Sequence, residues 1–193
     1  MIVIVDSGGA NLASVMFAVE RLGRPFTFTG DPDVIATASH VILPGVGAAG
    51  TAMKVLRERG LTECLSGLTR PVLGICLGMQ LLFDWSAEGS VEMLGLIPGK
   101  IQKFQGDMPI PHMGWNTLEI VRESELLRGL GGKPYVYFVH SYHAPTGDFT
   151  LAQTAYGTAF SSVIGRDNVF GCQFHPERSG KTGAQILKNF TEL

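Results

Sequence analysis

Short runs rich in valine and isoleucine, each bounded by glycine or proline, place the strongest constraint on the fold. Stretches with helical spacing of hydrophobic residues separate these runs in the first half of the chain. This alternation predicts βαβ units and therefore a parallel sheet with helices on both faces. The predicted strands are IVIVD (2–6), PFTFT (25–29), HVILP (40–44) and PVLGI (71–75).

The connection between the first two runs shows the helical pattern most clearly. Hydrophobic residues recur there at helical spacing from Leu12 to Leu22, and Gly23 provides a helix stop. GICLGMQLLF (74–83) also predicts a helix after Cys76, apolar nearly all round and buried.

The second half of the chain predicts antiparallel strands that close the sheet, followed by a C-terminal helix. Residues 89–116 contain many glycines and prolines with little periodicity, and we expect strand and loop at one edge. The sheet is therefore expected to be mixed but mostly parallel. The predicted strands are YVYFVHSYH (135–143), TLAQTAY (150–156), SSVIGR (161–166) and NVFGCQFH (168–175), and the helix is TGAQILKNFTEL (182–193).

Length and composition indicate one domain over residues 1–193. A chain of 193 residues, 45% hydrophobic, can bury one substantial core. Its net charge of −2 provides no basic surface for nucleic acid. No stretch approaches the roughly 18 apolar residues of a membrane span, and no signal peptide is evident. The three cysteines lack the spacing of a metal or redox site, so a cytoplasmic protein without disulfides is expected.

Cys76 lies where a predicted strand turns into a helix. Glycines at 74 and 78 flank it two positions away on either side, as in the GxSxG nucleophile elbow with sulfur in place of oxygen. Carboxyl ends of parallel strands are where α/β proteins place their reactive groups. A helix N-terminus would also favour the thiolate. The alternative is that Cys76 is a small buried hydrophobic residue, as expected for Cys64 and Cys172.

QFHPE (173–177) provides a base and a group to orient it. A cysteine nucleophile needs an adjacent base, and the base needs a partner that fixes its tautomer. Pro176 favours an extended conformation at His175, and positions 175 and 177 of an extended chain face the same way. The sequence therefore predicts that the His175 imidazole meets the Glu177 carboxylate. An incidental His-Pro-Glu at a strand end is the alternative.

LPGVGAAG (43–50) follows the third predicted strand and can bring main-chain N–H groups close to a ligand. Acyl transfer builds negative charge on a carbonyl oxygen, and glycines such as Gly45 and Gly47 let N–H groups approach it. The segment lacks the spacing of a nucleotide-binding loop. A glycine-rich turn without a catalytic task is the alternative. In HSYH (140–143), His140 and His143 are expected on opposite faces of a strand, which argues against a metal site.

PGVG, GICLGMQ and QFHPE together resemble the motifs of class I, triad-type glutamine amidotransferases, over nearly the whole chain. DSGGANLASV (6–15), PHMGWN (111–116) and YFVHSY (137–142) are similar to glutaminase subunits of imidazole glycerol phosphate synthases. The resemblance implies a flavodoxin-like α/β fold and hydrolysis of glutamine through a glutamyl thioester. It implies Cys76 as nucleophile, His175 as general base and acid, and Glu177 as the residue that orients the imidazole.

The resemblance also implies binding residues at matching positions. Gln80 and the backbone at Gly47, Ser141 and Tyr142 would hold the amino-acid end of glutamine. Gly45, Val46 and Leu77 would lie near the oxyanion. Five further positions are expected near the interface with a partner, namely Asn11, Ser14, Tyr137, His140 and Arg178.

The implied partner is a (β/α)8-barrel cyclase that forms a heterodimer with the glutaminase and receives its ammonia. The resemblance implies no cofactor. Many relatives have Tyr at 7 and Gly at 10, whereas this chain has Ser7 and Ala10, a departure that concerns the interface rather than the chemistry. A stand-alone cysteine hydrolase and a regulatory module whose thiol senses oxidation remain as alternatives.

Overall fold

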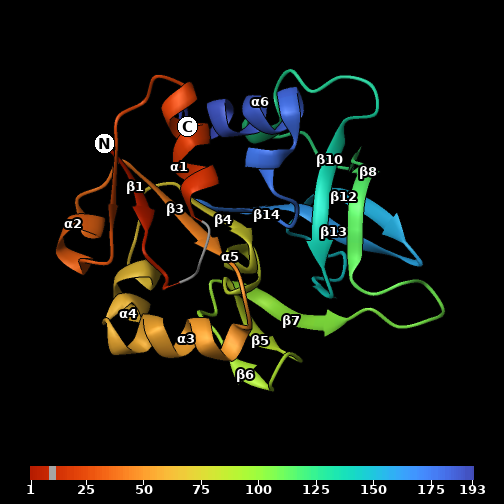
Figure 1. Cartoon of the computed structure of the whole chain (residues 1–193), viewed down its shortest axis with the longest axis horizontal. Helices are drawn as coiled ribbons and strands as arrows, with labels where there is room; N and C mark the ends of the chain where they lie inside the picture. Colours follow the sequence, from red (N-terminus) through yellow and green to blue (C-terminus); the bar gives the residue numbers. More distant parts are fainter. Residues whose placement is uncertain (9–11) are drawn as a thin grey trace.

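A computed structural model describes residues 1–8 and 12–193. Residues 9–11, which include the predicted interface residue Asn11, lie outside the described part. The main sheet has eight strands in the order β2-β1-β3-β4-β14-β13-β12-β9 (Figure 1). Its strands are β1 (Ile2–Val5), β2 (Phe26–Thr29), β3 (His40–Gly45), β4 (Val72–Cys76), β9 (Glu119–Ile120), β12 (Thr150–Tyr156), β13 (Thr158–Arg166) and β14 (Val169–Cys172).

Five neighbouring strands of this sheet run parallel and the last three run antiparallel. β2, β1, β3 and β4 coincide with the predicted runs to within one residue, and β14 pairs with β4 in parallel. β13, β12 and β9 continue the sheet with antiparallel pairing. The order 2-1-3-4 followed by a fifth parallel strand is that of flavodoxin-like folds, so the predicted fold class is confirmed.

Helices cover both faces of the sheet because its strands alternate two sets of buried side chains. Ile2 and Ile4 belong to the core beneath α1 (Ala13–Arg21) and α6 (Gly180–Phe190). Val3 and Val5 belong to the core on the other face, beneath α2, α3 and α4 (Figure 1). These helices span Pro32–Ala36, Ala49–Glu58 and Leu61–Ser66.

The region between α5 (Leu77–Gln80) and β12 departs from the expected single sheet. β10 (Tyr135–His140) pairs with β8 (His112–Thr117) in a two-stranded ribbon. The chain bends at Ser141, so β11 (Tyr142–His143) leaves the direction of β10 and pairs with β7 (Ile97–Lys103). β7 belongs to a four-stranded sheet with β5 (Phe83–Ser86) and β6 (Val91–Glu92). The prediction that residues 135–143 form one strand of the main sheet was therefore wrong.

The predicted helix after Cys76 is shorter than expected. α5 spans only Leu77–Gln80, and Phe83 already begins β5. The Leu82 carbonyl accepts hydrogen bonds from the N–H groups of Leu96 (2.8 Å) and Ile97 (2.9 Å), which turns the chain out of the helix. A short apolar run does not reveal where a buried helix stops. Two 3₁₀ turns, η1 (Glu125–Leu127) and η2 (Pro176–Arg178), complete the elements.

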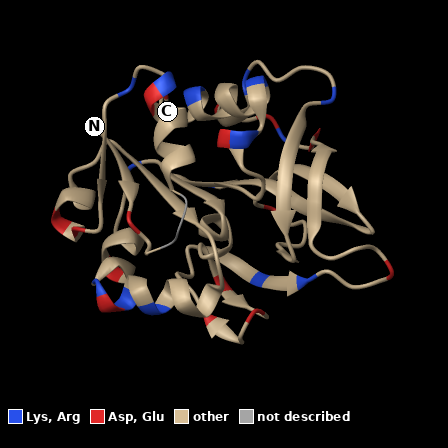
Figure 2. Ribbon diagram, viewed as in Figure 1, with Lys and Arg blue, Asp and Glu red and all other residues tan. Residues whose placement is uncertain are grey.

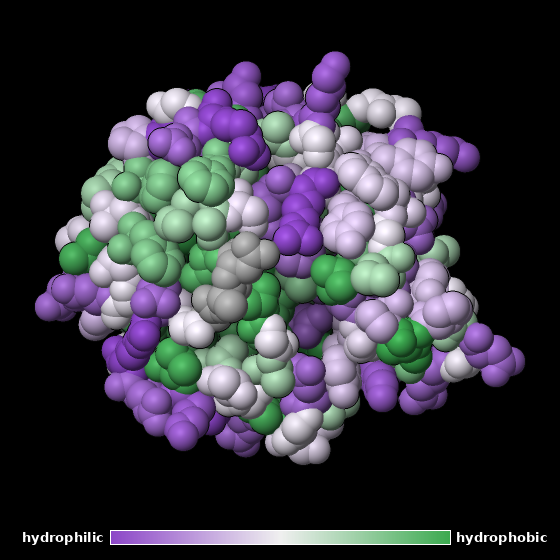
Figure 3. Space-filling view, viewed as in Figure 1, coloured by the Kyte–Doolittle hydropathy of each residue, from purple (hydrophilic) through white to green (hydrophobic). Residues whose placement is uncertain are grey.

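The surface carries both signs of charge, dispersed around the periphery (Figure 2). On the face shown in Figure 3, hydrophobic residues gather on the left and near the centre, where hydrophilic residues interrupt them. No helix within residues 1–8 and 12–193 is long and apolar enough to cross a membrane.

Candidate active site

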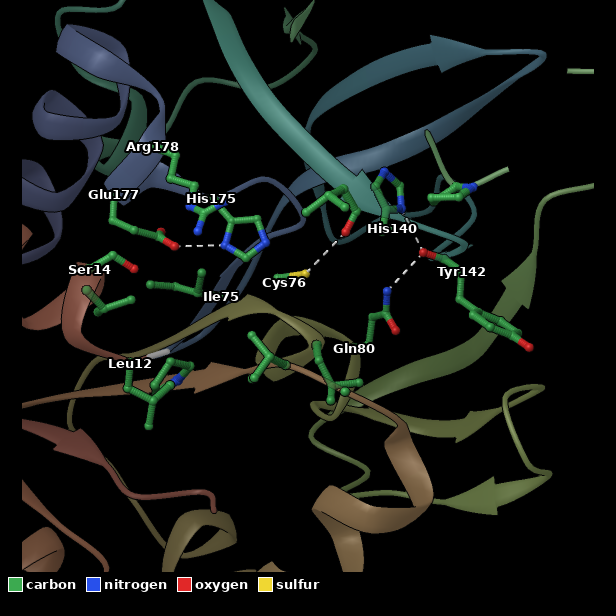
Figure 4. Close-up of a pocket in the computed structure, with 18 of the residues that line it drawn as sticks. Leu12, Ser14, Ile75, Cys76, Gln80, His140, Tyr142, His175, Glu177 and Arg178 are labelled. Carbon is green, nitrogen blue, oxygen red and sulfur yellow. Dashed lines mark hydrogen bonds and ion pairs between the residues drawn. The ribbon is translucent and has the colours of Figure 1, made fainter. Parts of the chain in front are cut away.

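A cavity of about 450 Å³ opens at the carboxyl ends of β3 and β4, beside the segment that follows β14. It brings together residues from both ends of the chain (Figure 4). Every predicted catalytic, oxyanion and substrate-binding residue lines it. These residues are Cys76, His175, Glu177, Gly45, Val46, Gly47, Leu77, Gln80, Ser141 and Tyr142.

Cys76 stands on a strained turn between β4 and α5. Its φ of 55° and ψ of −112° place a non-glycine residue in a region that L-amino acids rarely adopt. Such strain persists only when the surrounding structure imposes it. The sharp turn predicted from the flanking glycines is thus present.

Three glycines let the elbow pack directly against neighbouring main chain. A Cβ on Gly74 would lie 2.6 Å from the Gly78 carbonyl oxygen, and one on Gly45 would lie 2.5 Å from the Gly78 nitrogen. A Cβ on Gly78 would overlap the Leu43 carbonyl oxygen. The elbow of β4 and the end of β3 can therefore approach only because these positions carry no side chain.

The imidazole of His175 meets the carboxylate of Glu177, with Nδ1 2.8 Å from Oε1. Both side chains are nearly buried, at 10% and 3% exposure. His175 has the extended backbone expected before proline (φ −97°, ψ 97°). Glu177, however, lies within the 3₁₀ turn η2, so a turn rather than strand alternation brings the two side chains together.

The surroundings of His175 favour its protonated form. Burial lowers the pKa of the imidazole, but hydrogen bonding and charge attraction to Cys76 and Glu177 outweigh it. The net effect raises the pKa of His175 well above its ordinary value. In Figure 4 the ring lies between the Glu177 carboxylate and the Cys76 sulfur. Such an arrangement could supply a nucleophile, a base and an acid that orients the base.

Gln173 is a buried polar neighbour of the sulfur that the sequence did not single out. Its Nε2 lies 4.0 Å from the Cys76 Sγ, and its Oε1 accepts a hydrogen bond from Gln80 (3.0 Å). The Val139 carbonyl oxygen also lies 4.0 Å from the sulfur. Gln173 is the first residue of QFHPE, so the motif contained the signal that could have identified it.

The PGVG segment runs beside the elbow. Gly45 is the register partner of Cys76 in the parallel pairing of β3 with β4. Gly47 has a φ of +92°, which favours glycine, and Val46 is 36% exposed. The main chain of this segment and of Leu77 therefore borders the same cavity as the thiol.

One acidic residue of the cavity was missed. Glu88 lines it, and its Oε2 accepts a hydrogen bond from the Ala49 N–H at the start of α3 (2.8 Å). Nothing in the sequence pattern around Glu88 indicated this, because its position depends on the turn between β5 and β6.

The predicted substrate-binding residue Gln80 is 4% exposed, and its side chain donates to the Tyr142 carbonyl (2.9 Å).

The residues expected near a partner have different surroundings. Ser14 and Arg178 line the cavity, and Tyr137 is half-buried, with its ring 6.1 Å from that of Trp115. His140 also lines the cavity but is only 6% exposed, and its ring is turned inward. Ser7 is buried, and its hydroxyl donates to the Pro44 carbonyl (2.9 Å).

His140 and His143 do not lie on opposite faces, contrary to prediction. Because the chain bends at Ser141, both rings pack on Phe104, at centroid distances of 5.2 Å and 4.4 Å. Among the described residues, no group of three or more His, Cys, Asp or Glu side chains could hold a metal ion. Cys172 is fully buried, and burial together with the Glu177 charge raises the pKa of its thiol.

The family model described as glutamine amidotransferase class-I matches residues 3–193. The chain is a class-I glutamine amidotransferase. Within this family it belongs with proteins named imidazole glycerol phosphate synthase subunit HisH. That of Vibrio cholerae is 49% identical over 199 aligned residues, covering 100% of this chain and 98% of the relative. That of Idiomarina loihiensis is 51% identical over 193 residues, with 100% and 97% covered.

Solved structures of other glutamine amidotransferases share the fold at low identity. One described simply as a glutamine amidotransferase has a TM-score of 0.78 at 19% identity, covering 100% of this chain and 98% of its own. A glutamine amidotransferase from Thermotoga maritima has a TM-score of 0.64 at 16% identity, covering 99% of this chain and 82% of its own. The flavodoxin-like architecture of this amidotransferase is thus retained where few residues are shared.

Proposed function

We propose that this amidotransferase hydrolyses glutamine to glutamate and ammonia as the glutaminase subunit of an imidazole glycerol phosphate synthase. The observation that carries the proposal is the strained Cys76 elbow facing the His175–Glu177 pair inside a single cavity. The names of the relatives, at about half identity over the full chain, support the particular synthase. The role belongs to histidine biosynthesis, and the free thiols suit the cytoplasm.

The first half of the proposed reaction forms a thioester. The Cys76 thiolate attacks the side-chain carboxamide carbon, and the carbonyl oxygen becomes an oxyanion held by N–H groups among Gly45, Val46, Gly47 and Leu77. The protonated His175 then donates its proton to the leaving nitrogen, so that the C–N bond breaks and ammonia departs. Glu177 holds the imidazolium through Nδ1 and stabilises its charge.

The second half regenerates the enzyme. Neutral His175 takes a proton from a water molecule, whose oxygen attacks the thioester carbon. The tetrahedral intermediate collapses, the C–S bond breaks, and glutamate leaves with the added oxygen. The imidazolium and the thiolate are restored, and the steps use only side chains of this amidotransferase and water.

Charge in the cavity suits the amino-acid end of glutamine. Glu177 is engaged by His175, which leaves the Glu88 carboxylate to pair with the α-ammonium group. Gln80 and the main chain of Ser141 and Tyr142 provide polar groups for the rest of that end. Glutamine would therefore lie between the sulfur and Glu88.

The partner is proposed to be a (β/α)8-barrel cyclase in a heterodimer. Ammonia released into neutral water is mostly protonated and no longer nucleophilic, so direct transfer to an acceptor site benefits the synthase. The cyclase would use it to make imidazole glycerol phosphate and aminoimidazole carboxamide ribotide. Ser14 and Arg178 at the cavity, Tyr137 nearby, and the undescribed Asn11 are the proposed contacts.

The test is a pull-down with the cyclase, followed by a glutaminase assay with and without the cyclase nucleotide. We expect a heterodimer, feeble glutamine hydrolysis by the lone chain and a strong increase with partner and nucleotide. Cys76→Ala should remove the activity and also labelling by a glutamine-like diazoketone. Turnover of generic esters with none of glutamine would instead indicate a stand-alone cysteine hydrolase.

A further inference from the structure

Two buried histidines beside the cavity take no part in the proposed chemistry. His112 on β8 and His140 on β10 are directly opposite each other in the antiparallel ribbon. They are 3% and 6% exposed, and the His112 Nδ1 lies 3.0 Å from the His140 Nε2. Two imidazoles in direct contact away from water require a defined arrangement of protons.

Groups at both ends fix that arrangement. The Tyr142 carbonyl can only accept, so the His140 Nδ1 must carry the hydrogen of their 2.8 Å contact. The neutral His140 Nε2 then accepts, and the His112 Nδ1 donates to it. The His112 Nε2 is left to accept from the Asn116 Nδ2 at 3.3 Å.

The amide of Asn116 confirms this direction independently. Its Oδ1 accepts from the Thr117 N–H (2.8 Å), and its Nδ2 donates to the Ala155 carbonyl (3.3 Å), so the Nδ2 must face His112. All four nitrogens of the two rings are thereby satisfied. The hydrogen bonds run in one direction, from Asn116 through His112 and His140 to the Tyr142 carbonyl.

The Tyr142 carbonyl is where this chain of bonds reaches the cavity. The same oxygen accepts from the Gln80 Nε2 at 2.9 Å, and Figure 4 shows His140 and Gln80 converging on it. Both Gln80 and Tyr142 line the cavity, whereas His112 does not. His112 is therefore connected to the cavity through the hydrogen bonds of His140 and the Tyr142 carbonyl.

We propose that His112 and His140 are positioning residues for glutamine, holding the Tyr142 carbonyl and, through it, the Gln80 amide. The proposal rests on the proposed function, because it assigns these groups to glutamine. Without the His112 donor, the His140 Nε2 would be a buried acceptor with no partner, and its ring would no longer be fixed against Tyr142. Glutamine binding would weaken, while the thiol would be unaffected.

The packing of His112 offers a matched pair of variants. Its ring stacks on Phe138 at 4.7 Å and on Tyr156 at 4.1 Å. His112→Phe keeps an aromatic ring between these neighbours and loses the donor. His112→Asn loses the ring but places an amide N–H where Nδ1 stands. A role in hydrogen bonding predicts that Asn restores what Phe removes, whereas a role in packing predicts the reverse.

The experiment measures the alkylation of Cys76 in the full chain by iodoacetamide, with increasing glutamine as protectant. For His112→Phe we expect the half-protecting glutamine concentration to rise about twofold to tenfold, the range for one neutral hydrogen bond. The alkylation rate without glutamine should stay unchanged, and His112→Asn should return the concentration toward wild type. In the complex with the cyclase, the KM for glutamine should rise while kcat holds.

Several outcomes would overturn the proposal. It fails if His112→Phe binds glutamine like wild type, or if alkylation without glutamine changes in step with protection. Should His112→Phe not fold, Asn116→Ala removes the donor at the outer end, and an unchanged half-protecting concentration there would also refute it. Failure of the proposed function is distinguishable, because glutamine would then not protect Cys76 even in wild type.

Discussion

The Cys76 elbow and the histidine pair, of which His140 lines the same cavity, are held in place differently. At Cys76 the main chain is strained, and three glycines let it pack against other main chain. At His112 and His140 hydrogen bonds between side chains fix the positions, and neither residue is among the described non-glycine residues with positive φ. The elbow should therefore be intolerant of added atoms, and the histidine pair intolerant of lost donors.

The largest expected effect comes from removing the thiol at the elbow. Cys76→Ala should lower the glutaminase rate of the complex by about 10⁴-fold or more, because the covalent route is lost. The fold should persist, since Cys76 contributes only a small side chain to packing. Steady-state ammonia release and a thermal unfolding curve measure the two effects. Activity within tenfold of wild type would exclude Cys76 as the nucleophile.

Adding a single methyl group should break the elbow itself. In Gly78→Ala the new Cβ would overlap the Leu43 carbonyl oxygen, and main chain cannot move aside as a flexible side chain can. We expect a loss of more than about 3 kcal/mol in the free energy of unfolding. The control is Gly131→Ala, where a Cβ would meet nothing within 4 Å. Equal stability of the two variants would contradict the close-packed elbow.

Glu177→Gln tests the electrostatic part of the site. Loss of the carboxylate charge should lower the pKa of His175, because attraction to Glu177 helps to raise it. The protonated imidazole is then less stable, and the glutaminase rate should fall by about 10²- to 10⁴-fold. NMR titration of His175 and steady-state rates check the two results. If the pKa of His175 stays as in wild type, the Glu177 charge does not raise it.

Acid should destabilise the folded protein through the buried His112. Burial lowers the pKa of His112 to about 4, below the value of about 6.5 for a free histidine. The unfolded chain therefore binds a proton first, and stability is lost as the pH falls from about 6.5 toward 4. Between pH 7 and 5, wild type should lose about 1 to 2 kcal/mol more than His112→Phe. Denaturant unfolding at pH 7 and pH 5 measures the loss in each protein. Equal losses in the two proteins would refute this prediction.

The smallest effect isolates strain at the elbow. Glycine adopts a φ of 55° with a ψ of −112° without a steric penalty, whereas alanine does not. Cys76→Gly should therefore be more stable than Cys76→Ala by about 1 kcal/mol, although glycine ordinarily costs stability. Denaturant midpoints of the two inactive variants provide the comparison. A less stable glycine variant would mean that the turn is not strained.

The parts of the fold set by local pattern were predictable from the sequence. β1 to β4 follow from runs of branched residues, and the site from glycine spacing and His-Pro-Glu. The ribbon of β8 and β10 was not predictable, because its pairing depends on a bend at Ser141 and on contacts far along the chain. The same bend explains why the rings of His140 and His143 both pack against Phe104. Glu88 reaches the cavity through tertiary packing, which no local pattern encodes.

The position of β14 has a consequence for when the site forms during synthesis and folding. Ninety-seven positions separate Gln173 from Cys76, and β14 sits between β4 and β13. During synthesis Cys76 therefore emerges long before Gln173 and His175. Under the proposed function, a nascent chain would hydrolyse glutamine only after β14 has paired with β4, when folding is nearly complete.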